Sequence, residues 1–176
     1  MAAVRLPYRL QQTMFYGKQQ AVAPEIPEDA QALLSPPMLH QFRILDHRDQ
    51  QHLLTVHRLL AEQRADQDVL AAGLIHDVGK ACAKCRITVL DRGLHVILSQ
   101  FFKWPYTRFA AMEIPPAPLR GLHRLANHPN RGALAAQQAG YNDRVVYLVQ
   151  HHESGGDASD SGLQMLRRAD NSEEAR

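Results

Sequence analysis

Apolar residues follow a helical spacing along two central stretches of the chain. In the stretch 49–64 they fall on one face of a helix, which is the pattern of an amphipathic helix with one buried side. They are Leu53, Val56, Leu59 and Leu60. The next stretch, 69–78, is almost continuously apolar, with Asp68 in position to cap its beginning and Gly79 in position to end it. The pattern predicts an amphipathic helix followed by a buried one.

The rest of the pattern also favours helices, with two less regular stretches. A helix is expected to begin after Pro37. The stretch 87–102 fits either a helix or a β-hairpin, and its longer helical stripe favours the helix. The stretch 103–118 contains four prolines and is expected to be a loop or an irregular insertion. Further helices are expected over 119–127, 129–139, 142–152 and 163–169, with Asn142 as the N-cap of the third.

These elements predict an all-α chain with one hydrophobic core, and 176 residues suffice for a single domain. Residues 1–37 are expected to form an N-terminal extension in which an amphipathic stretch precedes a Pro-rich connector. Residues 38–171 would form the domain itself, and residues 172–176 a frayed tail. The extension either packs on the domain or takes part in a homodimer.

Composition and charge narrow the function classes only slightly. Apolar residues make up 45% of the chain and charged residues 22%, which is ordinary for a globular protein. The net charge is +2 and no Lys/Arg run forms a stripe, so nucleic-acid binding is not expected. Every apolar run is too short for a membrane span, and no signal-peptide core is recognisable at the N-terminus. A cytoplasmic location is expected by default.

Histidine is the unusual feature of the composition. There are ten histidines, and several neighbour another histidine or an aspartate. Imidazole is the commonest protein metal ligand. The apolar helix over 69–78 ends in the sequence His76-Asp77-Val-Gly-Lys80. A buried imidazole or carboxylate costs about 1–3 kcal/mol when left unpaired, and a single divalent cation would satisfy both side chains.

Further histidines and a late aspartate stand in a recognisable order around this pair. In chain order the set is His52, His76, Asp77, His128, His151, His152 and Asp170. This order resembles that of the HD-domain superfamily of metal-dependent phosphohydrolases, in which a His, a His-Asp pair, additional histidines and a late Asp succeed one another. The resemblance covers residues 38–171. It implies the helical bundle of an HD domain.

The resemblance also implies a site for two divalent metal ions. One ion would be held by His52, His76, Asp77 and Asp170. Asp77 would bridge to the second ion, which His128, His151 and His152 complete. Imidazoles and carboxylates suit Mn²⁺, Fe²⁺, Co²⁺ and Mg²⁺, and the affinity order of these ions does not choose among them.

The reaction that the resemblance implies is hydrolysis of a phosphate ester in a nucleotide or another small phosphorylated metabolite. A hydroxide shared by the two ions would attack the phosphorus. Asp77 and Lys80 would be the catalytic residues, with Lys80 and Arg131 binding the phosphate. The Gly-Tyr-Pro signature of the cyclic-di-GMP phosphodiesterase branch is missing from 154–162, which disfavours cyclic dinucleotides. A di-iron oxygenase on the same scaffold and a catalytically silent metal-binding regulatory module remain alternatives.

Several of these residues also have ordinary structural explanations. His57 competes with His52, but the two lie about 140° apart on a helix, and the family pattern favours His52. His128 stands before Pro129 and is typical of a helix end. Lys80 is typical of a charge at a helix C-terminus. The remaining histidines are expected to be surface or packing residues: His40, His47, His95 and His123.

Two other features have no assigned role. Cys82 and Cys85 form a lone CxxC, and a structural zinc would need about four ligands. They are expected to be two reduced cysteines in a loop. The aromatic stretch 101–106 is a candidate lid or partner surface. The acidic residues of 153–160 are expected to be solvated and to border the pocket.

Overall fold

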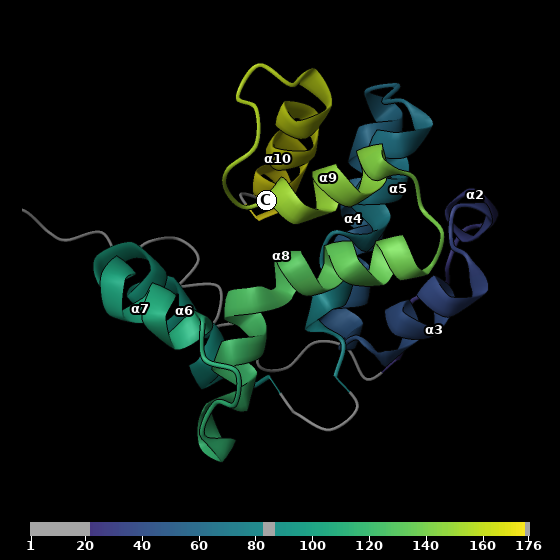
Figure 1. Cartoon of the computed structure of the whole chain (residues 1–176). Helices are drawn as coiled ribbons and strands as arrows, with labels where there is room; N and C mark the ends of the chain where they lie inside the picture. The colour runs from purple at the N-terminus through teal and green to yellow at the C-terminus, as the bar shows by residue number, and fades with distance from the viewer. Residues whose placement is uncertain (1–21, 83–86, 175–176) are drawn as a thin grey trace, which may run out of the picture. The chain divides into compact units, whose positions relative to one another are not determined.

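The structure is a computed structural model that describes residues 22–82 and 87–174. Within these residues the chain is helical and contains no strand (Figure 1), so the all-α prediction is confirmed. The α-helices are α2 (Glu28–Ala32), α3 (Pro36–Ile44), α4 (His47–Glu62), α5 (Gln67–Ile75), α6 (Val89–Phe101), α7 (Lys103–Ala110), α8 (Arg120–Gln138), α9 (Asp143–His151) and α10 (Ser161–Glu174). Two short 3-10 helices are η1 (Val78–Lys80) and η2 (Ala117–Leu119).

Backbone contacts divide the chain into two compact units, where the sequence predicts one domain over 38–171. The smaller unit comprises residues 1–19 and 83–127, and the larger one residues 20–82 and 128–176. The amphipathic stretch expected at the N-terminus lies outside the described residues. The end of the expected frayed tail, 175–176, does so as well, whereas α10 continues to Glu174.

Helix α5 is the centre of the larger unit. It packs against α4, α9 and α10, and all three are visible beside it in Figure 1. Its nearly continuous apolar sequence leaves it without a polar face, which is typical of a helix that is covered on all sides. The residues that it buries are Val69, Ala71, Ala72, Gly73, Leu74 and Ile75. The prediction of a buried helix in this stretch is confirmed.

Side-chain caps fix where the helices of the larger unit begin. Asn142 accepts from the backbone N–H of Val145 at 3.0 Å, so the predicted N-cap of α9 is confirmed. Helix α5 begins earlier than predicted, because Asp66 accepts from the N–H of Val69 at 2.9 Å. Asp68 is not the cap; its carboxylate accepts from the Asn142 side-chain amide at 2.9 Å.

The expected Pro-rich connector contributes to the core. It contains α2, and Ala30 and Leu34 pack with Met38 and Phe42 of α3 in the same buried cluster. Proline-rich sequence therefore does not separate this stretch from the domain. The stretch is also joined to a distant part of the chain, because the Tyr141 hydroxyl donates to the carbonyl of Leu33 at 2.7 Å and accepts from the N–H of Ser35 at 3.3 Å.

In the smaller unit, the prediction for 87–102 is confirmed and the prediction for 103–118 is corrected. The stretch 87–102 is helical, as its stripe favours, and α6 begins with a capping box between Thr88 and Asp91. The stretch 103–118 is not simply a loop, because α7 occupies Lys103–Ala110. Pro105 is compatible with this helix since it lies in the first turn, where backbone N–H groups have no intrahelical partner.

The predicted break between 119–127 and 129–139 is also wrong. Helix α8 runs from Arg120 to Gln138 with Pro129 in its interior. A proline there removes one backbone hydrogen bond but still adopts helical φ, so the helix continues at a cost. His128 therefore lies within a helix and does not end one.

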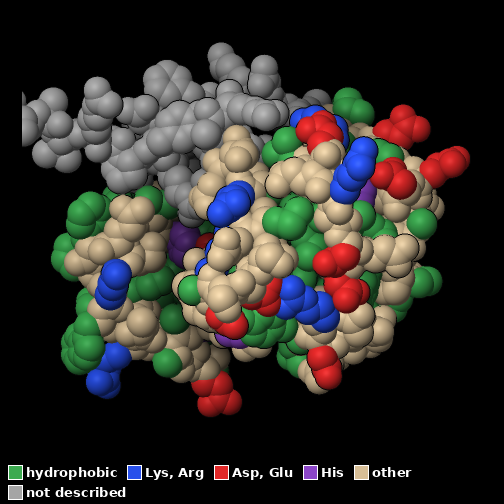
Figure 2. Space-filling model, turned by 90° about the horizontal axis from the view of Figure 1, so that it is seen from above, with side chains coloured by type: hydrophobic (Ala, Val, Ile, Leu, Met, Phe, Trp, Pro, Cys, Tyr) green, Lys and Arg blue, Asp and Glu red, His purple; other side chains and the backbone are tan. Residues whose placement is uncertain are grey.

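The surface carries charges of both signs. On the face that Figure 2 displays, Lys and Arg side chains are interspersed with Asp and Glu. Among the described helices, none combines the length and the apolar character that crossing a membrane requires.

The hydroxyl of Tyr141 should contribute to the stability of the larger unit. We expect Tyr141→Phe to lower the free energy of unfolding by about 1–2 kcal/mol, because it leaves the carbonyl of Leu33 and the N–H of Ser35 without this partner. Tyr147→Phe is the matched control, since its hydroxyl accepts from the exposed N–H of Asp157, which water can satisfy instead. Urea denaturation measures both, and equal losses would contradict the prediction.

Candidate metal centre

The end of α5 presents an imidazole and a carboxylate to the interior. His76 and Asp77 are 1% and 3% exposed. The Nδ1 atom of His76 lies 3.0 Å from the carbonyl of Gly73. A carbonyl can only accept, so Nδ1 carries the proton and the lone pair of Nε2 is directed away from the helix. This is the orientation that a metal-binding imidazole needs.

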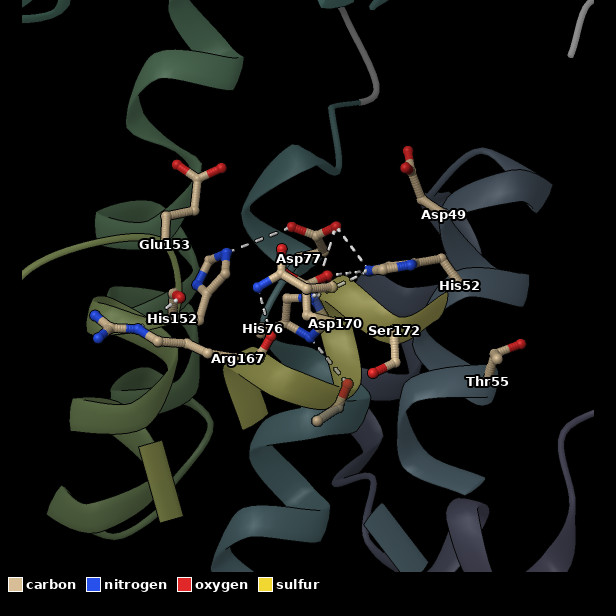
Figure 3. Close-up of polar contacts among 12 residues, drawn as sticks. Asp49, His52, Thr55, His76, Asp77, His152, Glu153, Arg167, Asp170 and Ser172 are labelled. Atoms are coloured by element: carbon tan, nitrogen blue, oxygen red, sulfur yellow. Dashed lines mark hydrogen bonds and ion pairs between the residues drawn. The ribbon is translucent and has the colours of Figure 1, made fainter. Parts of the chain in front are cut away.

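A first group of donor atoms gathers around this nitrogen. The Nε2 atom of His52, from α4, lies 3.2 Å from Nε2 of His76. Asp170, from α10, places its Oδ1 3.1 Å from Nε2 of His52 and 3.8 Å from Nε2 of His76. The Oδ2 atom of Asp77 lies 3.7 Å and 3.9 Å from the same two nitrogens. Figure 3 shows these four side chains pointing toward one another. We call them the first donor set.

A second group faces the other oxygen of Asp77. Oδ1 lies 3.1 Å from Nε2 of His128 and 3.7 Å from Nε2 of His152. The two nitrogens are 3.2 Å apart. The Nδ1 atom of His152 donates to the carbonyl of Val149 at 2.7 Å, which repeats the arrangement of His76 and Gly73. His128, His152 and Asp77 form the second donor set.

The spacing within each set is suitable for a metal ion. Metal–nitrogen bonds of about 2.0–2.1 Å place two neighbouring ligands about 2.9–3.4 Å apart in octahedral or tetrahedral geometry. The paired imidazole nitrogens of both sets, at 3.2 Å, fall in this range. The ligand atoms of His52, His76 and Asp77 lie within 4.8 Å of one another, as do those of Asp77, His128 and His152. Either group could therefore hold a divalent cation.

Local electrostatics favour the protonation states of metal ligands. Burial lowers the pKa of His76, and burial together with the neighbouring imidazoles lowers the pKa of His152 to about 3. Burial opposes ionisation of Asp77, but Lys80 and the imidazoles of His76 and His128 hold its pKa well below the usual value. At neutral pH these two imidazoles are therefore neutral and the carboxylate is ionised, which are the forms that bind cations.

Among the other ligand candidates, the pKa of His128 is raised and that of Asp170 is lowered. Burial acts against protonation of His128, yet Glu153 and Asp77 raise its pKa. Burial likewise opposes ionisation of Asp170, but the hydrogen bond from His52 and the nearby His76 lower its pKa. The carboxylates of Asp77 and Asp170 are thus anionic, and His128 carries a proton more readily than His76 or His152.

Lys80 lies beside the cluster, as η1 follows directly on Asp77. Its Nζ donates to Oδ2 of Asp77 and lies 4.0 Å from Oδ1 of Asp49 in α4. The lysine is therefore within the candidate centre and not merely a charge at a helix end.

Two predicted site residues are not brought into the cluster. The ring of His151 packs against Tyr147, with ring centroids 4.7 Å apart, and is half-exposed. Arg131 is exposed on α8, and no contact between it and either donor set occurs among the described residues. His57, the competitor of His52, is buried elsewhere, with Nε2 3.3 Å from Asp29 and Nδ1 3.5 Å from the carbonyl of Leu70.

The sequence contains a signal that separates His152 from His151. The buried face of α9 consists of Val145, Leu148 and Val149, and His152 follows these at a helical spacing of three and four. His151 continues the opposite row, after Tyr147. Adjacent residues on a helix point about 100° apart, so only one histidine of the pair faces the cluster.

Glu153 borders the centre, as the sequence predicts for the acidic residues of 153–160; it is one-third exposed and reaches within 3.8 Å of His128. Two other contributors to the centre are not predicted from the sequence. Asp49 is buried beside Lys80. Arg167 donates to the carbonyls of His151, His152 and Gly155 at 2.6–3.1 Å and so joins the end of α9 to α10. A guanidinium at a helix C-terminus satisfies carbonyls that have no intrahelical donor.

Gly79 has a different role from the predicted one. Helix α5 ends at Ile75, and Gly79 lies in η1 without a positive φ. A Cβ at this position would lie 1.9 Å from the carbonyl oxygen of His128 and 2.7 Å from the N of Gly132. The glycine is required because the backbone of η1 rests directly on α8. This contact holds Asp77 at a fixed place relative to His128.

His95 and His123 make their contacts within the smaller unit. His95 Nδ1 is 2.5 Å from the hydroxyl of Tyr106, and His123 Nε2 is 2.9 Å from the carbonyl of Met112. The sequence predicts two reduced cysteines, but Cys82 is disulfide-bonded and the described residues contain no free cysteine. Cys85 lies outside the described residues.

No protein-family model, no curated protein and no solved structure matches this chain.

Replacing Gly79 should disturb the centre by displacing η1 from α8. We expect Gly79→Ala to destabilise the larger unit by about 3 kcal/mol or more, since the added carbon meets backbone atoms that cannot rotate away. Gly93→Ala is the control, because a Cβ there meets nothing within 4 Å and alanine favours a helix. Thermal unfolding compares the two variants. A Gly79→Ala protein as stable as wild type would contradict the close contact.

The neighbouring histidines of α9 offer a matched pair. We expect His152→Ala to bind metal at least tenfold more weakly than wild type, because it removes a nitrogen of the second donor set. His151→Ala should retain wild-type affinity, since its ring packs on Tyr147. Isothermal titration with Mn²⁺ and elemental analysis give the affinities and the metal content. Equal losses in both variants would rule out the arrangement of the second donor set.

Proposed function

We propose that the chain is a metal-dependent phosphohydrolase of the HD-domain type, which hydrolyses a phosphate ester in a nucleotide or another small phosphorylated metabolite. The observation that carries the proposal is the division of one carboxylate between two donor sets. Oδ2 of Asp77 faces His52 and His76, whereas Oδ1 faces His128 and His152. A carboxylate in this position is suited to bridge two ions.

The residue types of the two donor sets support divalent metal ions as the cofactor. Four imidazoles and two carboxylates, with no thiolate among them, suit Mn²⁺, Fe²⁺, Co²⁺ or Mg²⁺. Two divalent ions held there would lower the pKa of a water molecule and neutralise charge on the attacked phosphate. His52, His76 and Asp170 would hold the first, His128 and His152 the second, and Asp77 both.

The charge of the centre supports metal dependence. Asp77, Asp170 and Asp49 lie within it, and Lys80 donates to Asp77 and lies 4.0 Å from Asp49. With His76 and His152 neutral, the centre carries a net negative charge and would repel a phosphate. Divalent cations reverse this sign, so phosphate binding should require them.

Lys80 supports the choice of substrate class. Its ammonium lies at the edge of the first donor set, where it donates to Oδ2 of Asp77. An ammonium there would bind a non-bridging phosphate oxygen and stabilise the charge that develops on it. The order of the ligand residues along the chain, which resembles that of HD-domain phosphohydrolases, points to the same reaction.

Phosphate release by the purified protein tests this function. The protein is stripped with a chelator, reloaded with each of Mn²⁺, Fe²⁺, Co²⁺ and Mg²⁺ under anaerobic conditions, and assayed against a panel of nucleotides and sugar phosphates. Activity should appear only after reloading. Products that form only in the presence of O₂ would favour a di-iron oxygenase, and metal binding without turnover on any substrate would favour a regulatory module.

Lys80→Ala separates substrate binding from metal binding. We expect the variant to retain its metal and to lose about 100-fold in kcat/KM, the usual effect of removing one donor to a developing oxyanion. Lys103→Ala, which removes an exposed lysine of α7, is the control and should match wild type. An unchanged rate in Lys80→Ala would return this lysine to a structural role.

A further inference from the structure

Asp49 is a buried acidic residue that the proposed reaction leaves without a role. It lies in the first turn of α4, is 5% exposed, and precedes His52 by three residues on the same helix. Figure 3 shows both side chains projecting from that helix, His52 toward Asp77 and Asp49 to one side of it. The spacing of Asp49 from Leu53, Val56 and Leu60 places it on the apolar stripe of α4. A carboxylate on a buried stripe is rarely tolerated without a nearby cation.

Lys80 is a cation close to Asp49, and its ammonium lies between the carboxylates of Asp49 and Asp77. Its Nζ is hydrogen-bonded to Oδ2 of Asp77 and lies 4.0 Å from Oδ1 of Asp49. The lysine thus donates a hydrogen bond to Asp77 and lies slightly beyond hydrogen-bond distance of Asp49. The side chain is 15% exposed, so water competes only weakly for the ammonium.

The contact of Lys80 with Asp77 opposes a metal ion in the first donor set. Oδ2 is the oxygen of Asp77 that faces the nitrogens of His52 and His76. An ammonium and a divalent ion on the same oxygen repel each other, and a poorly hydrated site screens this repulsion only weakly. Entry of an ion therefore favours displacement of the ammonium from Oδ2.

Among the described residues, Asp49 offers Lys80 a second carboxylate close to its present position. A charge-assisted N–H···O bond is about 2.8 Å long, so Nζ needs to move only about 1 Å toward Oδ1 to form one. The lysine stem has several rotatable bonds and its ammonium has three donors, which makes so small a displacement easy.

We propose that Asp49 is a positioning residue: it accepts the Lys80 ammonium when a divalent ion occupies the first donor set. The inference rests on the proposed metal site. Lys80 competes with the ion for Asp77, and Asp49 relieves this competition by holding the lysine beside the loaded centre. From there the ammonium is available to a phosphate oxygen. Asp49 thus makes metal loading and substrate binding compatible.

The ordinary role of an acidic residue at this position is to stabilise the helix N-terminus. Asp46, the N-cap of α4, provides the matched control, because its side chain accepts from the N–H of Arg48 at 3.0 Å. Asp46→Asn removes one negative charge from the same helix end. It should leave metal affinity within about twofold of wild type.

A double-mutant cycle on metal binding tests the proposal. Affinity for Co²⁺ alone is measured by isothermal titration and by the d–d absorption of the bound ion, with no substrate present. Asp49→Asn should weaken binding of the first ion by about tenfold or more, the usual range for a residue that supports a ligand. Lys80→Met should bind Co²⁺ more tightly than wild type. In the Lys80→Met background, Asp49→Asn should cost no more than about threefold.

Equal effects of Asp49→Asn in the two backgrounds would overturn the proposal, because Asp49 would then act directly on the ion or on the fold. Unchanged or weaker Co²⁺ binding by Lys80→Met would overturn it as well, and this measurement holds even if Asp49→Asn fails to fold. Circular dichroism of each variant reports on folding. The cycle needs no turnover, so absence of phosphatase activity would count against the proposed function and not against this role of Asp49.

Discussion

The two donor sets depend on one carboxylate whose oxygens point in different directions. Asp77 can serve both because it lies in the turn between α5 and η1, where the backbone is no longer helical and the side chain is directed between α4 on one side and α8 with α9 on the other. Two contacts fix the position of that turn. It follows the buried end of α5, and Gly79 approaches the backbone of His128 closely. The rest of the centre is arranged around this turn.

Orientation of the imidazoles is achieved within single helices. His76 and His152 each donate Nδ1–H to a carbonyl three residues earlier, at the end of α5 and of α9. The carbonyls at a helix C-terminus have no intrahelical donor, so the histidine satisfies the helix end while the helix fixes its tautomer. The same short sequence feature, a histidine just after a buried helical turn, therefore serves stability and ligand geometry together.

Much of this centre could be predicted from the sequence, for identifiable reasons. The apolar run before His76 indicates a buried helix end, and buried polar groups require partners. The face of α9 distinguishes His152 from His151, provided that the register of Val145 and Val149 is read. Asp49 could be recognised in the same way, because it lies on the apolar stripe of α4. These signals are local, and periodicity reports them directly.

Other features could not be predicted because they depend on tertiary contacts. Pro129 argues locally for a break, yet α8 continues through it. The proximity of Lys80 to Asp49 joins segments whose pairing no local pattern encodes. The requirement for glycine at position 79 arises from the distance to another helix, whereas sequence reasoning attributes it to a helix end. The division into two units likewise reflects contact density and not composition.

The guanidinium of Arg167 would connect the stability of the fold to any ion held by the two donor sets. Its hydrogen bonds join the end of α9 to α10, three residues before Asp170. His152 of the second donor set and Asp170 of the first are therefore carried by two helices that are directly bonded to each other. An ion bound at either set would join chain segments that are distant in sequence, and because it would bind the folded state and not the unfolded one, it would stabilise the fold. If the centre holds an ion, removing that ion would therefore loosen the helix ends that carry its donor atoms, and these ends would become more open to proteolysis.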